Sequence, residues 1–301
     1  MNIVHMSRTP LAGAPKMLCR ALQKYDQRSN KYNYIHITPE TVNAAETKHH
    51  VMNADIIHWH NEVYFPIYNA VKNKKHVIQY HSEPGISGVG RAPVPSNFRE
   101  LVIAQYHSAL NYFKHCTPVR NIIDINLDVD ISTYRQSDVI ICSSLSTHRF
   151  GVWQTKDVER HAHVMRRVTE HFKGKVSIYY KNLNNLPWSE VMRHKYNSDI
   201  VLDECVTPSY HLSSLEGLAC GKPTICWVDD RVERELLKSC KSDTNPFIGT
   251  YIGWLEDFLV DLIEKGPENL LQIGKKSYEW YNKYWNSHDI VAEFNAIYND
   301  I

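Results

Sequence analysis

Residues 199–228 read DIVLDECVTPSYHLSSLEGLACGKPTICWV, and this stretch decides the fold. The apolar runs at 200–202 and 224–228 each predict a buried strand. Between them, a segment that starts near Ser213 and stops at a glycine predicts a short helix with Glu216 in its first turn. A helix start offers free N–H groups and a positive dipole end to phosphate. A nearby carboxylate can accept hydrogen bonds from ribose hydroxyls. The stretch therefore predicts a site for a nucleotide or nucleotide-sugar.

The same alternation of strand and helix runs through most of the chain. Short apolar runs are separated by helix-length segments, a pattern that predicts parallel sheets with crossover helices. Most of the runs lack polar alternation, as expected of strands that are covered on both faces. The predicted strands are 3–6, 34–37, 55–59, 76–80, 139–142, 176–180, 200–202 and 224–228.

These strands form two sets of four, one before residue 85 and one between residues 139 and 228. The segment between the sets predicts a glycine- and proline-containing loop, a long helix and a connection, at 84–95, 97–113 and 118–132. An α/β fold with two Rossmann-like domains facing a cleft fits this division better than one continuous sheet. The chain from residue 231 on predicts helices, and Ser287-His288-Asp289 predicts the N-cap of the last one, at 290–298.

Composition indicates a globular protein without a strong charge bias. Hydrophobic residues make up 43% and charged residues 22% of the 301 residues, and the formal charge is +1. Such a charge creates no global field toward nucleic acid or anionic membrane. The N-terminus lacks the features of a signal peptide, and no run approaches the roughly 20 apolar residues that a membrane span needs.

The seven cysteines are odd in number and form no CxxC pair. Cys142, Cys220 and Cys226 lie in apolar runs, which predicts buried thiols in a reducing compartment. We therefore expect a cytoplasmic protein, with peripheral contact to a membrane left open.

Two local motifs each have a structural and a functional interpretation. The loop SRTPLAGAP at 7–15 leads into a helix at 16–25, and Gly13 would let a ligand approach the backbone closely. An ordinary strand-to-helix turn explains the same glycine. Likewise, Ser213 and Glu216 have the spacing of a capping box, in which the carboxylate bonds to the backbone of Ser213 and needs no ligand.

The stretch EGLACGKPT at 216–224 resembles the Glu-Ala-Met-Ala-x-Gly-Lys-Pro-Val motif of family 4-like glycosyltransferases of the GT-B fold. Weaker similarities follow in the family's order along nearly the whole chain. DIIHWH at 55–60 resembles its Asp-Val-Val-His-x-His strand, and QYH at 79–81 resembles its strand that ends in histidine. The first strand with its Gly13 loop and the last predicted helix also look like their counterparts in the family.

The resemblance implies three domain segments. It implies an acceptor-side domain at 1–132, a nucleotide-sugar-binding domain at 133–286, and a closing helix at 287–301 that packs back on the first domain.

The resemblance also implies roles for individual residues. Glu216 would bind the ribose hydroxyls, and His81 would contact the transferred sugar. Arg149 and Lys156 are the available cations that would stabilise the departing diphosphate. The diphosphate itself would meet the N–H groups of Leu212, Ser213, Ser214 and Leu215. The structural alternatives stay open: both cations can be solvated surface charges, and His81 can be a locally satisfied strand end.

The chain departs from the family pattern at two positions. Pro208 stands where the family often has a second glutamate, eight residues before Glu216. The usual Lys-Gly pair is Lys156-Asp157 here. The match to the family pattern is therefore weaker in the sugar-binding part than in the nucleotide-binding part.

Two motifs raise the question of a metal. Asp128-Val129-Asp130 matches the metal motif of the other main glycosyltransferase fold, GT-A, but it lies in the predicted connection, where turn chemistry favours Asp. His58 and His60 share one face of a strand, but the sequence places no third ligand beside them. We therefore expect no metal and no cofactor apart from the nucleotide-sugar co-substrate, for which a UDP-sugar is one candidate.

We expect a glycosyltransferase that moves a sugar from a nucleotide-sugar to an acceptor, with retention and without metal, as the resemblance implies. Two alternatives remain. One is a non-catalytic nucleotide- or sugar-phosphate-binding protein on the same fold, and the other is a metal-dependent GT-A transferase that uses Asp128 and Asp130. The acceptor is not readable from the sequence: it can be a glycan, a glycolipid, a protein or a modified nucleic-acid base.

Overall fold

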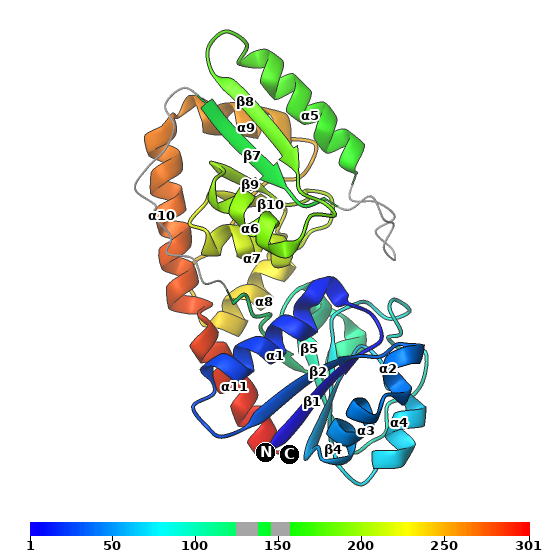
Figure 1. Ribbon diagram of the computed structural model, residues 1–301. Helices are drawn as coiled ribbons and strands as arrows, with labels where there is room; N and C mark the ends of the chain where they lie inside the picture. The colour runs from blue at the N-terminus through cyan, green and yellow to red at the C-terminus, as the bar shows by residue number, and fades with distance from the viewer. Residues whose placement is uncertain (125–137, 146–156) are drawn as a thin grey trace. The chain divides into compact units, whose positions relative to one another are not determined.

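The computed structural model describes residues 1–124, 138–145 and 157–301, and the chain divides into two compact units (Figure 1). Unit 1 comprises 1–124 together with 285–301, and unit 2 comprises 125–284. Each unit is an α/β domain built on one parallel sheet.

The sheet of unit 1 has six strands in the order β2-β1-β3-β4-β5-β6, and all of its pairs are parallel. The strands are β1 (Asn2–Ser7), β2 (Lys31–His36), β3 (Ile56–His60), β4 (Lys75–Tyr80), β5 (Phe98–Ile103) and β6 (Thr117–Val119). The α-helices of this unit are α1 (Ala14–Tyr25), α2 (Pro39–Asn43), α3 (Ala45–Met52), α4 (Phe65–Val71) and α11 (Ser287–Asn299). Short 3₁₀ turns lie at Leu11–Gly13, Tyr106–Ala109 and Asn111–Phe113.

Unit 2 repeats this plan with five parallel strands in the order β11-β10-β9-β7-β8. Its strands are β7 (Asp138–Ser143), β8 (Ser177–Asn182), β9 (Ile200–Leu202), β10 (Thr224–Cys226) and β11 (Ile248–Gly249). Its helices are α5 (Val158–His171), α6 (Trp188–Tyr196), α7 (Leu212–Ala219), α8 (Asp230–Cys240), α9 (Leu255–Glu264) and α10 (Pro267–Tyr284). In both sheets the strand order reverses between the first and third strands of the unit, which makes a topological switch point.

All eight predicted strands are present, but the helix predicted at 97–113 is wrong. Strand β5 occupies the start of that segment, and 3₁₀ turns follow it. The run Leu101-Val102-Ile103 is fully buried. A short buried apolar run is compatible with both a helix and a strand. This run forms a strand because it pairs in parallel with β4 and β6. Strand β6, at the start of the predicted connection, and the two-residue strand β11 were also not predicted.

The closing helix α11 packs within unit 1. Its Asn295 donates to Asp26 Oδ1 at 3.0 Å, and its Glu293 pairs with the buried Arg120 at 2.6 Å. The N-cap predicted at 287–289 is wrong, because the helix already starts at Ser287. Asn286 is the cap and accepts from the backbone N–H of Asp289 at 2.9 Å, while Ser287 donates to Ile123 O at 3.1 Å.

The core of unit 2 is aliphatic, and Ile141, Leu202 and Ile225 are fully buried in it. All seven cysteines are free and buried, which confirms the prediction for Cys142, Cys220 and Cys226. Among the described residues, no helix combines the length and the apolar character that crossing a membrane would require.

Gly217 lets α7 lie directly on the sheet of unit 2. A Cβ atom at this position would lie 2.4 Å from Thr224 Oγ1 and 3.0 Å from Val201 Cβ, so the helix would have to move off the sheet.

We therefore expect Gly217→Ala to lower the free energy of unfolding by about 1–3 kcal/mol, measured by urea denaturation. Gly249→Ala is the matched control, because a Cβ there meets nothing within 4 Å. The control should change stability by less than about 0.5 kcal/mol. Equal stability of the two variants would contradict the close approach of α7.

Candidate active site

The start of α7 lies at the carboxyl edge of the sheet of unit 2, beside the switch point between β7 and β9. Strand β9 ends at Leu202, and the loop from Asp203 to His211 leads into α7. Ligands of open parallel sheets bind at this edge, in the crevice at the switch point. The predicted phosphate-binding residues therefore lie where the fold favours a ligand.

Side chains of the preceding loop order the first turn of α7. His211 is the N-cap residue, and its backbone N–H donates to Ser214 Oγ at 3.2 Å. Ser214 in turn donates to the Asp203 carboxylate, which also bonds His211 Nδ1 at 3.1 Å. Because Asp203 directly follows β9, the strand end and the helix start are tied together.

Glu216 does not form the predicted capping box with Ser213, so that interpretation is wrong. Its carboxylate instead pairs with Lys195 Nζ at 2.5 Å and accepts from Trp188 Nε1 at 3.0 Å. Lys195 is fully buried and also donates to Ser213 O at 3.1 Å and Ser213 Oγ at 2.9 Å. A lysine on α6 thus holds both the carboxylate and the first turn of α7.

In this arrangement the Glu216 carboxylate can still accept hydrogen bonds from a ligand. A carboxylate has about four lone-pair sites, and Lys195 and Trp188 each engage one oxygen. Glu216 is 7% exposed, so any ligand would meet it in a largely desolvated setting. The ribose role predicted for Glu216 is compatible with this geometry and stays a prediction.

The four predicted phosphate-binding residues differ in accessibility. Leu212 and Ser213 are partly exposed, and their N–H groups are the first donors of the helix. Ser214 and Leu215 are fully buried, and their N–H groups bond back to His211 O at 3.1 and 3.2 Å. Of the four N–H groups predicted to bind the diphosphate, only those of Leu212 and Ser213 are therefore accessible.

The loop supplies no free carboxylate in place of the missing glutamate. Pro208 is buried, and the nearby Glu204 is fully buried. Glu204 Oε2 accepts the N–H groups of Val206 and Thr207, both at 2.8 Å, and its Oε1 accepts the Thr207 hydroxyl. Glu204 therefore shapes the loop and is not poised toward a sugar.

In unit 1, His81 and Gly13 also lie at the carboxyl edge of their sheet. His81 follows β4, its backbone N–H donates to Asn61 Oδ1 at 2.6 Å, and its Nε2 bonds His60 Nδ1 at 2.9 Å. His81 keeps some solvent contact, yet desolvation lowers its pKa to about 3. Gly13 follows β1, has φ +81°, and faces open space where a Cβ would stand. The structure thus keeps both positions available to a ligand.

Arg149, Lys156, Asp128 and Asp130 lie outside the described residues. The neighbouring Asp157 explains one departure from the family pattern, because it stands where the family has glycine and has φ +47°. Glycine favours this left-handed region, and aspartate tolerates it. Asp157 is also the N-cap of α5, where its carboxylate accepts from the N–H of Arg160 at 3.2 Å.

Two important residues of this site, Lys195 and Trp188, were not predicted from the sequence. The available signal was a lysine on an apolar helix face, because Val191, Met192 and Lys195 of α6 are buried together. A fully buried lysine needs a partner. Only the packing of α6 beside α7 shows that this partner is Glu216.

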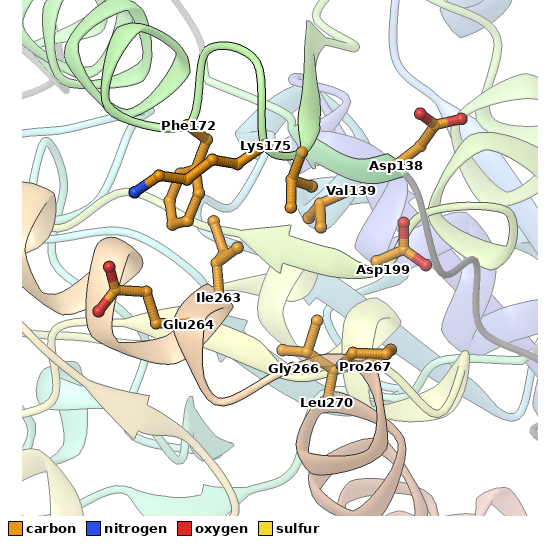
Figure 2. A pocket seen from close by; sticks show the side chains of 11 residues that line it. Asp138, Val139, Phe172, Lys175, Asp199, Ile263, Glu264, Gly266, Pro267 and Leu270 are labelled. Atoms are coloured by element: carbon orange, nitrogen blue, oxygen red, sulfur yellow. The ribbon is translucent and has the colours of Figure 1, made fainter.

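A pocket of about 250 Å³ lies elsewhere in unit 2 (Figure 2). Asp138 and Val139 at the start of β7 line it, as do Asp199 before β9, Gly266 before α10 and Pro267 at the start of α10. It therefore opens at the amino ends of the strands, opposite the edge at which such sheets bind ligands. We do not assign it to the site.

Comparison with solved structures identifies the fold. Sucrose-phosphate synthase from Thermosynechococcus elongatus aligns with a TM-score of 0.60 and 12% identity over 100% of this chain and 99% of that one. HepE of Anabaena in complex with UDP aligns at 0.58 and 11% over 100% of both chains. A glycosyltransferase from Rickettsia africae aligns at 0.57 and 13% over 99% and 97%.

This chain has the GT-B fold. The recognition of that fold from the sequence is confirmed, and the alternative of a GT-A transferase is wrong. No protein-family model matches the chain, and a search of curated proteins finds no match.

His161 on α5 braces the loop that carries Asp203. Its Nε2 accepts the N–H of Cys205 at 3.2 Å, and its Nδ1 bonds Asp157 O at 2.9 Å. Protonation of Nε2 would break the bond to Cys205. Burial lowers the pKa of His161 below its usual 6.5.

This shift predicts how stability depends on pH. Below pH 6.5 the unfolded chain binds a proton that folded His161 does not, so stability falls as the pH is lowered. The slope from this residue is at most about 1.4 kcal/mol per pH unit. We expect His161→Gln to flatten the dependence, measured by urea unfolding between neutral pH and about pH 5. His163→Gln, at an exposed position of the same helix, should keep the wild-type slope; an unchanged slope in His161→Gln would contradict the assignment.

Proposed function

We propose that this protein is a glycosyltransferase that takes its sugar from a nucleotide-sugar, with a UDP-sugar as the donor. The observation that carries the proposal is the Glu216 carboxylate held beside the start of α7, at the carboxyl edge of unit 2. Solved structures of the same fold include HepE in complex with UDP and with UDP-glucose. In this proposal Glu216 binds the ribose, and the N–H groups of Leu212 and Ser213 receive the diphosphate.

Trp188 supplies a binding surface for the base. Trp188 is 40% exposed although its Nε1 donates to Glu216. An exposed aromatic ring stacks on a base at low entropic cost, because the indole is held rigidly by its hydrogen bond. The ribose carboxylate and the base platform are thus one hydrogen-bonded unit.

Lys195 is a positioning residue in this proposal. It is fully buried and donates to Glu216 and Ser213, so it orients the carboxylate and the helix start that would hold the nucleotide. A buried ion pair contributes little net stability, but loss of one partner costs about 3–5 kcal/mol. The pair therefore fixes geometry more than it stabilises the fold.

The transfer itself is proposed to proceed with retention and without a metal ion in the reaction. Arg149 and Lys156 would neutralise the leaving diphosphate, and His81 would contact the transferred sugar. Such a site acts by positioning the reactants and by electrostatic stabilisation of the leaving group. Transfer that requires an added divalent ion would contradict the metal-independent step.

A second candidate is a binding protein on the same fold without transfer activity. Pro208, in place of the family's second glutamate, favours it, since no carboxylate in the 203–211 loop replaces that group. Incubation with a panel of labelled nucleotide-sugars separates the two. Slow hydrolysis or transfer supports the enzyme, and tight binding without turnover in any acceptor extract supports the binding protein.

We expect Glu216→Gln to weaken UDP binding by about 10- to 100-fold, because hydrogen bonds from the ribose to a charged acceptor are lost. Isothermal titration well below the melting temperature measures the effect. Glu293→Gln is the control for stability, because it breaks the pair with buried Arg120 in unit 1 and should leave the affinity unchanged. The 2′,3′-dideoxy analogue of UDP should bind wild type and Glu216→Gln equally well. Equal losses for UDP and the analogue would assign Glu216 a purely structural role.

We expect Trp188→Leu to lose about 1–3 kcal/mol of binding free energy for UDP, the usual contribution of stacking on an aromatic ring. Trp188→Phe should recover most of it, although it removes the hydrogen bond to Glu216. The partly exposed Trp227 is the control position, and Trp227→Leu should leave UDP affinity unchanged. If Trp188→Leu and Trp227→Leu behave alike, Trp188 is not the base platform.

A further inference from the structure

One face of the sheet in unit 1 buries imidazole rings in place of hydrocarbon. His5 on β1 and His58 and His60 on β3 point to the same side, and His5 pairs with His58 in register. Each of the three is at most 1% exposed. The opposite side is apolar, with Val4 and Ile57 in the core cluster. Burying three polar rings together is costly unless their nitrogens are satisfied.

The three rings bring nitrogens together at metal-ligand spacing. One ring nitrogen from each histidine lies within 4.8 Å of the other two. His5 Nδ1 and His60 Nε2 share a hydrogen bond of 3.2 Å, which an ion bound between the two rings would replace. Two imidazole ligands on one tetrahedral Zn²⁺ ion are about 3.3 Å apart, given Zn–N bonds of about 2.0–2.1 Å. This pair is already at the required separation. Rotation of the His58 ring about its χ2 torsion, which is soft in histidine, can bring its nitrogen to the same separation from the other two.

The other nitrogen of each ring has an outer partner. His58 Nδ1 bonds the Tyr298 hydroxyl of α11 at 2.7 Å, and His5 Nε2 lies 3.4 Å from the same hydroxyl. His60 Nδ1 bonds His81 Nε2 at 2.9 Å. Metal-binding histidines are almost always held in this way through their second nitrogen, which fixes the tautomer and the ring orientation.

Two buried atoms beside these rings make no hydrogen bond. His58 Nε2 is one, and Gln79 Oε1 is the other, in the part of the chain that the structure describes. Gln79 pairs with His60 in register across β3 and β4, and its side chain lies beside His58. A proton on His58 Nε2 can be accepted by Gln79 Oε1, so the two atoms can satisfy each other, and an ion bound by both is the other arrangement that satisfies them.

We propose that His5, His58 and His60 form a binding site for one divalent transition-metal ion, Zn²⁺ or a similar ion that prefers imidazole. The ligand atoms are His5 Nδ1, His58 Nε2 and His60 Nε2. The Gln79 amide oxygen stands beside them as a fourth ligand. This site departs from our expectation that His58 and His60 lack a third ligand, and it does not depend on the proposed transferase activity.

The chemistry of the donor set selects the class of ion. Neutral imidazole suits zinc, copper, iron and nickel, whereas magnesium and calcium prefer oxygen. Imidazole binds metals in its neutral form, and the ring of His5 is fully buried. Since His60 also bonds His81, a bound ion would fix the ring of the predicted sugar-contacting histidine at the sheet edge.

The test uses the full chain produced without a polyhistidine tag in zinc-supplemented medium and purified without chelator. Elemental analysis should find about one zinc ion per chain. After removal with chelator and reloading with Co²⁺, the protein should show the visible d–d absorption of a tetrahedral site. X-ray absorption should show nitrogen ligands at about 2.0–2.1 Å from zinc. Absence of zinc together with absence of the cobalt spectrum overturns the proposal.

Two variants locate the ion. His58→Leu should reduce zinc to about a tenth of an equivalent or less, because it leaves only two imidazole ligands, and the neutral amide oxygen of Gln79 is a poor zinc ligand in place of the third. His76→Leu is the matched control, since His76 is fully buried on the neighbouring strand β4 and stacks on Phe98, away from the three ligands. Full zinc content in His58→Leu overturns the proposal.

A milder variant covers the case in which His58→Leu does not fold. Tyr298→Phe keeps all three ligands and removes only the outer hydroxyl that His5 and His58 share, so zinc affinity should fall by about 10- to 100-fold. Titration of the metal-free protein with zinc measures this change. An affinity equal to that of wild type overturns the assigned ligand atoms.

Discussion

Parallel pairing of every described strand is the constraint on which the rest of the structure depends. Parallel neighbours need crossover helices, and these helices bury both faces of each sheet. Parallel strands also end at one edge, so the residues that follow them are collected there. His81 after β4 and Asp203 after β9 lie at such edges for this reason. The candidate site is thus a consequence of topology before it is a consequence of particular side chains.

Buried polar groups mark the places where the chain departs from a simple core. Lys195 lies on the buried face of α6 and is compensated by Glu216 and by Ser213. The histidines of β1 and β3 occupy a sheet face that hydrocarbon could fill. An aliphatic core would be cheaper at both places. The buried polar groups at these two places are the physical argument for the two proposed ligands, a nucleotide in unit 2 and a metal ion in unit 1.

Local sequence predicted the strands well and the caps poorly. Central strands are continuous apolar runs, so all eight predicted ones are present. Caps depend on which side chain reaches which N–H group, and several candidates within a few residues look alike. The predicted Ser213–Glu216 capping box is therefore absent, and His211 and Ser214 cap α7 instead. Likewise, Asn286 caps α11 in place of the predicted residues at 287–289. The helix predicted at 97–113 was wrong for another reason, because pairing with β4 outweighed the helical pattern of the segment.

The sequence by itself determined the α/β class and the two sheets, because apolar runs and turn residues are local signals. The GT-B fold was recognised from the resemblance of the 216–224 stretch to a family motif. The sequence also placed Glu216 in the helix between β9 and β10, but the predicted first-turn position is wrong, because α7 starts at Leu212 and Glu216 lies just beyond its first turn. Only the tertiary structure decided what Glu216 touches, because Lys195 and Trp188 reach it from a different helix. In the same way, His58 and His60 share a strand, but strand order alone brings His5 beside them. Contacts between distant segments depend on sheet topology, which no local pattern encodes.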